Sequence, residues 1–144
     1  MATILLLRYR LDGIDLDVEI STSTEAPVEI EKLIKQLRSD FGRDFIITLA
    51  PVASALSGGN NISGFSYTTL EADCGSDINW YNAQFYSGFG SMNETTDYDN
   101  IITNLPLDPS RLLAGNPFEQ VQRFWVGGVE YHKIHNKAVN AEVW

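Results

Sequence analysis

The stretch that decides how this chain folds lies near its N-terminus and reads Leu11-Asp12-Gly13-Ile14-Asp15-Leu16-Asp17-Val18-Glu19. Its β-branched and aliphatic residues favour a strand, and side chains alternate between the two faces of a strand. Asp15, Asp17 and Glu19 therefore share one face, and three aliphatic residues share the other. The aliphatic face can be buried against helices, whereas a carboxylate withdrawn from water without a partner is costly. A row of three acids therefore needs a structural or chemical reason.

Spacing alone leaves three explanations for this acidic row. The first is the solvated face of an edge strand, which would need neither Gly13 nor the aliphatic back row. The second is a set of oxygen ligands for a divalent cation, although the common calcium loop places its ligands on a turn around a glycine. The third is catalysis, since acids whose pKa values are perturbed by their neighbours often mark active sites.

The composition fits one globular domain. The 144 residues are 44% hydrophobic and 20% charged, with a formal net charge of -9 and a pI near 4.5. This charge argues against nucleic acid or an anionic membrane as a partner, because both favour clustered Lys and Arg. A neutral ligand such as a sugar is compatible with it. The sequence shows neither a metal cluster nor a glycine-rich phosphate loop, so we expect no metal and no other cofactor.

Processing signals are few. The single cysteine, Cys74, excludes an intrachain disulfide, and we interpret it as a half-buried thiol rather than a nucleophile. The apolar run at residues 4–7 is too short for a membrane span or a secretory signal, so no targeting signal is visible and the compartment is left open. Two triplets, Asn61-Ile62-Ser63 and Asn93-Glu94-Thr95, fit the N-glycosylation acceptor pattern, which matters only for a secreted chain.

Beyond the acidic stretch, the apolar pattern alternates between helices and strands. Helices are predicted at residues 27–41, with Pro27 in the first turn and Gly42 just past the end, and at 65–72, 98–105 and 118–124. Strands are predicted at 45–51, 77–87, 112–114 and 126–131, and residues 52–63 are predicted to be a loop. Strands and helices that alternate through short links are typical of parallel α/β packing.

The sequence motif at residues 11–19 also resembles that of a known family. Asp12, Asp15, Asp17 and Glu19 form the pattern D-x-x-D-x-D-x-E, which resembles the signature on the fourth strand of the glycoside hydrolase family 18 barrel. Residues 45–51, 63–67 and 78–90 continue the resemblance, and within that family they look most like the fungal endo-β-N-acetylglucosaminidases. The resemblance covers roughly residues 11–115 well. It implies an α/β fold that is a partial (β/α)8 TIM barrel, roughly strands four to eight.

A complete barrel of this kind needs about 250 residues, and the chain begins at what would be strand four. We therefore expect residues 1–144 to form a single truncated catalytic domain of the family 18 type. An open half-barrel exposes two sheet edges and an apolar inner face, which favours self-association or disorder. Whether such a chain turns over substrate is left open by the sequence.

The resemblance also implies a substrate-assisted mechanism. Glu19 would be the general acid that protonates the glycosidic oxygen, and Asp17 would hold the 2-acetamido group whose carbonyl oxygen attacks the anomeric carbon. Water would then open the oxazolinium-type intermediate with retention. The expected partner is an oligosaccharide or N-glycoprotein that contains N-acetylglucosamine, cut at the β-1,4 bond after this sugar, as in the chitobiose core of an N-glycan.

Charge repulsion supports an acid role within the row. Same-face residues on a strand lie about 7 Å apart, and two unit charges at that distance repel by roughly 2 to 3 kcal/mol at an effective dielectric constant of about 20. Such repulsion raises a pKa, so we expect Glu19 to keep its proton towards neutral pH. Asp15 is expected behind Asp17, sharing a proton or a hydrogen bond with it.

The resemblance further implies that Tyr86 donates its hydroxyl to the acetamido carbonyl and that Gln84 hydrogen-bonds in the same pocket, because both face inward from one strand. Asp12 is the remaining candidate for substrate binding, and we place Trp80 in the core rather than in the pocket.

The last predicted strand departs from the family pattern, because His132 follows Gly127-Gly128-Val129 where the family has a pocket-floor tryptophan. We interpret His132 as a chance residue rather than a catalytic base. Three functions follow in order of preference: a glycosidase of the endo-β-N-acetylglucosaminidase or chitinase type, a carbohydrate-binding relative without turnover, and an inactive remnant. The retained Glu19 favours the enzyme.

Overall fold

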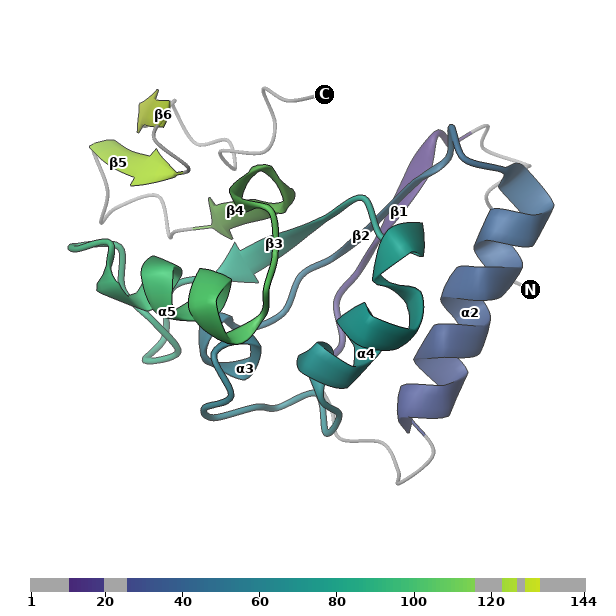
Figure 1. The fold of residues 1–144 in the computed structure, drawn as a ribbon, viewed down its shortest axis with the longest axis horizontal. Coiled ribbons are helices and arrows are strands. Elements are labelled where there is room, and N and C mark those ends of the chain that lie inside the picture. The colour runs from purple at the N-terminus through teal and green to yellow at the C-terminus, as the bar shows by residue number, and fades with distance from the viewer. Residues whose placement is uncertain (1–10, 20–25, 116–122, 127–128, 133–144) are drawn as a thin grey trace.

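The computed structural model describes residues 11–19, 26–115, 123–126 and 129–132. Four strands form a parallel sheet in the order β1-β2-β3-β4, namely β1 (Gly13–Leu16), β2 (Ile46–Leu49), β3 (Trp80–Gln84) and β4 (Leu112–Gly115). Between consecutive strands lie α2 (Ala26–Phe41), α3 (Ala53–Leu56), α4 (Tyr67–Cys74), η1 (Gly75–Asp77), α5 (Thr96–Asn104) and η2 (Pro109–Arg111). The predicted parallel α/β architecture of a partial barrel is confirmed (Figure 1).

The acidic stretch forms β1, which is shorter than predicted but alternates as expected. The aliphatic residues at 14, 16 and 18 are buried or half-buried, whereas Asp15, Asp17 and Glu19 are exposed. Gly13 allows β1 to approach β2, because a Cβ atom at this position would lie 2.6 Å from the carbonyl oxygen of Ile46. Any larger residue at position 13 would therefore push the two strands apart.

The apolar core lies between the sheet and its helices. The sheet contributes alternate residues, of which the buried ones are Leu16, Ile47, Leu49, Tyr81, Ala83, Leu112 and Ala114. The helices contribute Ile34, Leu37, Leu70, Cys74, Tyr98 and Ile101, all of them buried. Fully burying an apolar side chain of this size contributes about 1.5 to 3 kcal/mol, so this layer is the main source of stability.

Helix α2 has the ends that the sequence predicts. Pro27 lies in its first turn, and Gly42 follows its last residue with φ 79, a left-handed conformation that glycine adopts without strain. Arg38 in the last turn donates to the carbonyl oxygen of Asp77 at 2.9 Å and to Oδ1 of Asn79 at 2.5 Å. The end of α2 is therefore tied to the segment that leads into β3.

A second polar cluster joins α4 to the sheet. Both Arg111 amino groups bond the carboxylate of Glu71, and the Tyr81 hydroxyl donates to Oε2 of the same carboxylate at 2.7 Å. Glu71 thus finds partners for both oxygens although its side chain is only 14% exposed. A buried carboxylate is tolerated only with such partners, so the cluster fixes α4 against β3 and the start of β4.

Several element boundaries differ from the prediction. The predicted loop at residues 52–63 contains the one-turn helix α3, whose sequence ASAL is too short to show helical periodicity. The helix predicted at 65–72 begins at Tyr67, because Ser66 caps it by accepting from the backbone N–H of Thr69 at 3.2 Å. Strand β3 occupies only the middle of the predicted 77–87, since η1 precedes it and a turn follows it.

The C-terminal predictions are wrong where the structure describes them. Of the predicted helix at 118–124, residues 118–122 lie outside the described residues, and 123–124 belong to strand β5 (Arg123–Val126). The single strand predicted at 126–131 is instead divided between β5 and β6 (Val129–His132), which pair antiparallel with each other. Apolar runs show a strand but not its partner, so four parallel barrel strands are confirmed and a fifth is not seen in the described part.

Among the described residues, no helix is both long and apolar enough to cross a membrane. The same residues contain no group of three or more His, Cys, Asp or Glu side chains that converge as metal ligands. The acidic row therefore spreads along a strand and does not form a chelating cluster.

Candidate active site

The carboxyl ends of β1, β2 and β3 carry the polar groups that the sequence singles out. Asp15 is in register with Thr48, and Thr48 with Trp80. Since partners in parallel strands point to the same side, these residues and those two positions further along lie on the inner face of the sheet. Thr48 is fully buried, and its Oγ1 donates to Oδ1 of Asp15 at 2.6 Å. Asp15 is thus held by a neighbour on β2.

Gln84 joins the acidic row to β3. Its Nε2 donates to Oδ1 of Asp17 at 3.3 Å, to Oε1 of Glu19 at 3.2 Å and to the carbonyl oxygen of Ala50 at 2.8 Å. Gln84 is only 8% exposed, although both carboxylates are exposed. The structure therefore brings Asp17, Glu19 and Gln84 together, as expected from the sequence.

The three acceptors determine how the Gln84 amide is oriented. Asp17, Glu19 and Ala50 all present oxygen atoms, so the nitrogen and not the oxygen of the amide must face them. The amino group has two hydrogens for three acceptors, and the longest contacts are those to the carboxylates. One hydrogen is therefore shared between Asp17 and Glu19.

The pKa of Asp17 is raised. Burial is the largest cause, followed by the negative charges of Glu19 and then Asp15, while the hydrogen bond from Gln84 works in the opposite direction. The carboxyl group of Asp17 can therefore hold a proton more readily than a carboxyl group in water.

Tyr86 lies beside the same acids. It is half-buried, and its pKa is raised first by burial and then by the charges of Glu19 and Asp17, so both charges act on the phenol. The chain turns immediately after it: Ser87 and Gly88 have φ 56 and φ 84, and the N–H of Phe89 donates to the Tyr86 carbonyl oxygen at 3.0 Å. A left-handed serine is an unfavourable conformation that tends to persist at functional sites.

One sequence candidate, Asp12, lies outside this group, as does Trp80, which the sequence places in the core. Asp12 precedes β1, so it lies at the opposite end of the strand from Glu19, and the alternation places it on the other face. The structure therefore does not bring Asp12 to the acids. Trp80 is half-buried on the inner face, below Gln84, and its Nε1 donates to Oδ1 of Asn82 at 3.0 Å.

Sequence reasoning missed two neighbours of the row. Thr48 donates the hydrogen bond to Asp15. It is a polar residue within the apolar run 45–51, and this could have indicated that it has a polar partner on the inner face. The second is Tyr67, whose hydroxyl hydrogen-bonds Oγ of Ser63 at 3.0 Å. Burial raises the pKa of Tyr67 to about 12, and the charge of Asp17 adds to that shift. The phenol of Tyr67 therefore lies near the row as a neutral group.

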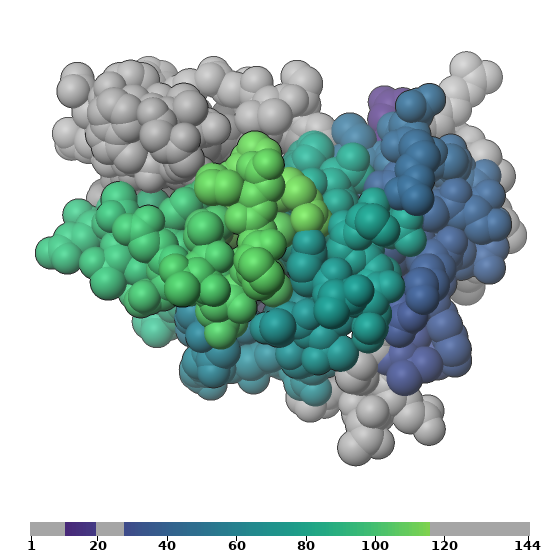
Figure 2. Space-filling view, viewed as in Figure 1, coloured from purple at the N-terminus to yellow at the C-terminus, as the bar shows by residue number. Residues whose placement is uncertain are grey.

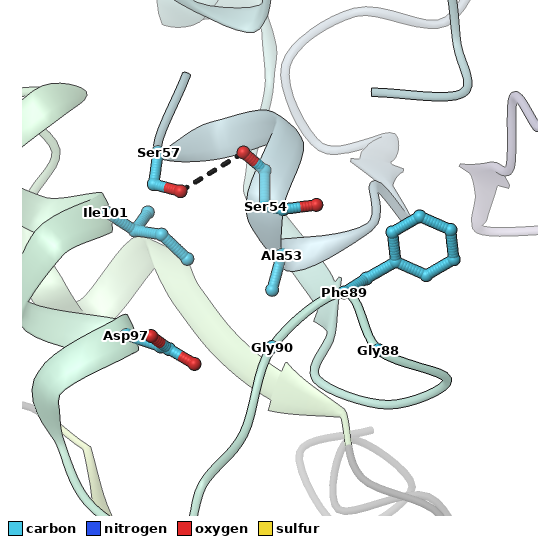
Figure 3. Close-up of a pocket in the computed structure, with 8 residues that line it drawn as sticks. All are labelled: Ala53, Ser54, Ser57, Gly88, Phe89, Gly90, Asp97 and Ile101. Atoms are coloured by element: carbon cyan, nitrogen blue, oxygen red, sulfur yellow. Dashed lines mark hydrogen bonds between the residues drawn. The ribbon is translucent and has the colours of Figure 1, made fainter. Parts of the chain in front are cut away.

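A pocket of about 230 Å³ lies next to the turn that follows Tyr86 (Figure 3). Its walls come from α3, α5 and the turn after β3, and the lining residues are Ala53, Ser54, Ser57, Gly88, Phe89, Gly90, Asp97 and Ile101. The N–H of Ser54 donates to the Phe89 carbonyl oxygen at 2.8 Å, which anchors the turn after Tyr86 to α3. None of the three acids of the row lines this pocket.

Together these features define a class of protein. Active sites of parallel α/β barrels lie at the carboxyl ends of the strands, where the inner-face acids, Gln84 and Tyr86 are found here. Closely spaced carboxylates with one raised pKa are suited to acid-base chemistry. The chain is thus part of an enzyme-type barrel with a carboxylate site.

Comparison with known proteins specifies the class further. The structure resembles a fungal endo-β-N-acetylglucosaminidase from glycosyl hydrolase family 18, with a TM-score of 0.72 and 52% identity over 77% of this chain and 38% of that one. It also resembles the chitinase ChiC from Aspergillus fumigatus, with a TM-score of 0.71 and 47% identity over the same shares of the two chains. A family 18 chitinase from Pseudoalteromonas aurantia matches with a TM-score of 0.61 and 26% identity.

Sequence comparison gives a consistent result. The chain is 34% identical over 87 residues to chitinase 63 of Streptomyces plicatus and to chitinase C of Streptomyces lividans. The match covers 56% of this chain and 13% of each of these relatives, and no family model matches the chain. The resemblance to glycoside hydrolase family 18 is confirmed, and the four-stranded sheet corresponds to part of such a barrel.

Proposed function

We propose that this chain carries the catalytic acids of a family 18 glycosidase that cleaves the β-1,4 bond after an N-acetylglucosamine by substrate-assisted, retaining hydrolysis. The observation that supports this most directly is the shared contact of the Gln84 amide with Asp17 and Glu19, beside Tyr86. It means that the two acids converge at the carboxyl end of the sheet, where a barrel binds its substrate.

Each residue takes the role that its position allows. Glu19 is the outermost acid and exposed, so it is the one that can reach a glycosidic oxygen and protonate it. Asp17 has the raised pKa, so it can carry a proton and donate a hydrogen bond to the acetamido group. Asp15, held by Thr48, supplies the negative charge behind Asp17 that helps to keep that proton in place.

The substrate's own acetamido oxygen acts as the nucleophile in this proposal. Tyr86 donates its hydroxyl to that group, and its raised pKa keeps it a donor at neutral pH. Gln84 holds Asp17 and Glu19 at a constant separation and completes the wall of the pocket. The reaction requires no metal, since the nucleophile comes from the sugar and the proton comes from Glu19.

We infer the chitobiose core of an N-glycan as the preferred substrate. The 52% identity to the endo-β-N-acetylglucosaminidase supports this choice, and the 47% identity to the Aspergillus fumigatus chitinase keeps chitin as the second candidate. The chain spans 38% of either protein. The activity of the whole protein, like its substrate, is therefore part of this proposal.

Replacement of the acid tests the assignment. We expect Glu19→Gln to lower the hydrolysis of a high-mannose glycoprotein by about 10² to 10⁴-fold, the usual contribution of a general acid. Deglycosylation is read as a faster band on a gel, and binding of the released glycan should be preserved because the side chain keeps its size. Glu29→Gln is the matched control, since Glu29 is exposed on α2 and pairs with Lys32 at the surface.

Two results would decide against this function. Turnover by Glu19→Gln at the rate of the unmodified chain would end the catalytic assignment of this residue. Hydrolysis of chitin oligosaccharides with no action on the glycoprotein, measured in the same assay, would select the chitinase alternative.

A further inference from the structure

The two N-glycosylation triplets lie in different structural settings. Asn61 is half-buried in the loop before α4, and both ends of its side-chain amide are engaged. Its Nδ2 donates to the carbonyl oxygen of Phe65 at 2.6 Å, and its Oδ1 accepts from the backbone N–H of Ser63 at 2.8 Å. Ser63, the third residue of this triplet, is fully buried, and its hydroxyl is bonded to that of Tyr67. The side chains of Asn61 and Ser63 are therefore both engaged in the fold.

The second triplet lies on the surface. Asn93, Glu94 and Thr95 are all exposed, in the segment between β3 and α5. The backbone N–H of Asn93 donates to Oγ of Ser91 at 3.2 Å, and none of the hydrogen bonds in the described part of the chain uses the Asn93 side-chain amide. Figure 2 shows the mid-green segment that includes α5 at the outer edge of the molecule, on the left of the view.

Glycan transfer makes clear demands on the acceptor. The asparagine Nδ2 forms a bond to C1 of an oligosaccharide, while the bond from C1 to the phosphate oxygen of a pyrophosphoryl lipid donor breaks. The lipid leaves with the electron pair, and Nδ2 loses one proton. The asparagine must therefore present a free amide, with a hydroxyl residue two positions on and no proline between them. Asn93, with Glu94 and Thr95, meets each requirement.

A glycan on Asn61 conflicts with the contacts of its amide. Nδ2 donates one of its two hydrogens to the Phe65 carbonyl oxygen and Oδ1 accepts from Ser63, so a sugar on Nδ2 has to fit beside Phe65, which is only 5% exposed. A glycan on a surface segment meets no such conflict.

We propose that Asn93 is the N-glycosylation site of this protein, occupied when the chain passes through the secretory pathway, and that Asn61 stays unmodified in the folded protein. The proposal does not depend on the proposed hydrolase function, because it uses only the accessibility and the hydrogen bonding of the two triplets.

To test this, the chain is expressed in yeast behind a secretory signal, and the glycopeptides of the secreted protein are mapped by mass spectrometry. The folded fraction is expected to carry a glycan, or the single N-acetylglucosamine left after trimming, on the peptide with Asn93 and nothing on the peptide with Asn61. Asn93→Gln is expected to abolish the modification, and Thr95→Ser to retain it. Occupancy of Asn61 in the folded fraction, or an unmodified Asn93, would overturn the proposal.

A second measurement tests the same site without requiring that the variant folds completely. Translation of the chain behind a cleavable secretory signal, in the presence of microsomes, reports the modification of Asn93 before folding is complete. We expect a gel shift that is sensitive to glycosidase and that decreases by one glycan in Asn93→Gln. The same shift in the unmodified chain and in Asn93→Gln, with signal cleavage as proof of translocation, would rule out Asn93.

Discussion

At the scale of single residues, the site depends on how three acids share their charge. Asp17 lies between Asp15 and Glu19, and it is Asp17 whose pKa is raised. Gln84 donates to Asp17 and Glu19, yet its bond to Asp17 is long at 3.3 Å and only partly offsets the repulsion. The site is thus prepared to hold a proton on Asp17.

This arrangement predicts how stability depends on pH. A raised pKa means that folded Asp17 binds its proton more tightly than unfolded Asp17 does. Stability is therefore lost as the pH rises from the unfolded value of about 3.9 through the folded value, and the cost persists above it. We expect Asp17→Asn to raise the melting temperature at neutral pH. The corresponding gain in unfolding free energy should be less than about 1 kcal/mol, because the exposed charges are screened.

The comparison is made by thermal unfolding at about pH 7 and about pH 3, since the gain should vanish at the lower pH, where both states are protonated. Asp44→Asn is the control, because Asp44 is exposed and lies outside the acidic row. A lower melting temperature of Asp17→Asn at neutral pH would show that the charge of Asp17 is stabilising and would contradict the pKa argument.

The sequence was informative at this scale wherever alternation along a strand decided the outcome. Asp15, Asp17 and Glu19 lie on one face, and Gln84 meets two of them, as predicted. Alternation also places Asp12 on the other face of the strand from these acids, although Asp12 belongs to the same sequence motif. The raised pKa of Asp17 could not be predicted, because its largest cause is burial, which depends on the packing around the strand.

At the scale of elements, Gln84 reaches β1 by crossing β2 over a small residue. Asp17 and Gln84 lie on the inner face of their strands, and Ala50 follows Thr48 by two positions on the same face. The backbone of Ala50 accepts from Gln84, and its methyl group leaves the path to both carboxylates open. The size of residue 50 therefore sets the geometry of the site.

Enlarging this residue tests the element-scale argument. We expect Ala50→Leu to force Gln84 away from Asp17 and Glu19 and to lower kcat/KM by about tenfold or more, which corresponds to about 1.4 kcal/mol. The measurement is steady-state hydrolysis of the glycan substrate, with circular dichroism as the check on folding. Ala72→Leu adds the same volume at an exposed position of α4 and should leave the kinetics unchanged. Equal kinetics for both variants would mean that the Gln84 bridge is not needed.

Element boundaries were predicted where local chemistry is strong. Helix α2 begins and ends as Pro27 and Gly42 indicate, since both residues act through their own backbone angles. Helix α3 was missed because four residues are held by packing rather than by periodicity. The antiparallel pairing of β5 with β6 was missed for a related reason, because a strand pattern does not specify the direction of its partner.

At the scale of the whole molecule, the strands lie in the parallel order β1-β2-β3-β4 (Figure 1). Their register places the acids on and just after β1 and the polar residues of β3 on one face of the sheet. Two polar clusters, centred on Arg38 and on Glu71 with Arg111, join the helices to the strands. The chain matches 38% of the length of the fungal endo-β-N-acetylglucosaminidase and of the Aspergillus fumigatus chitinase ChiC. Within that share it contains the acids, Gln84 and Tyr86.

The central claim is that these residues catalyse hydrolysis with the help of the substrate's own acetamido group. Its most direct test compares a chitobiose-core substrate with a matched substrate in which the sugar before the cut carries a free amine. Because the intramolecular nucleophile is lost, we predict that the rate falls by about 10²-fold or more with the amine. Equal rates on the two substrates would contradict the account, because the nucleophile would then not be the acetamido oxygen.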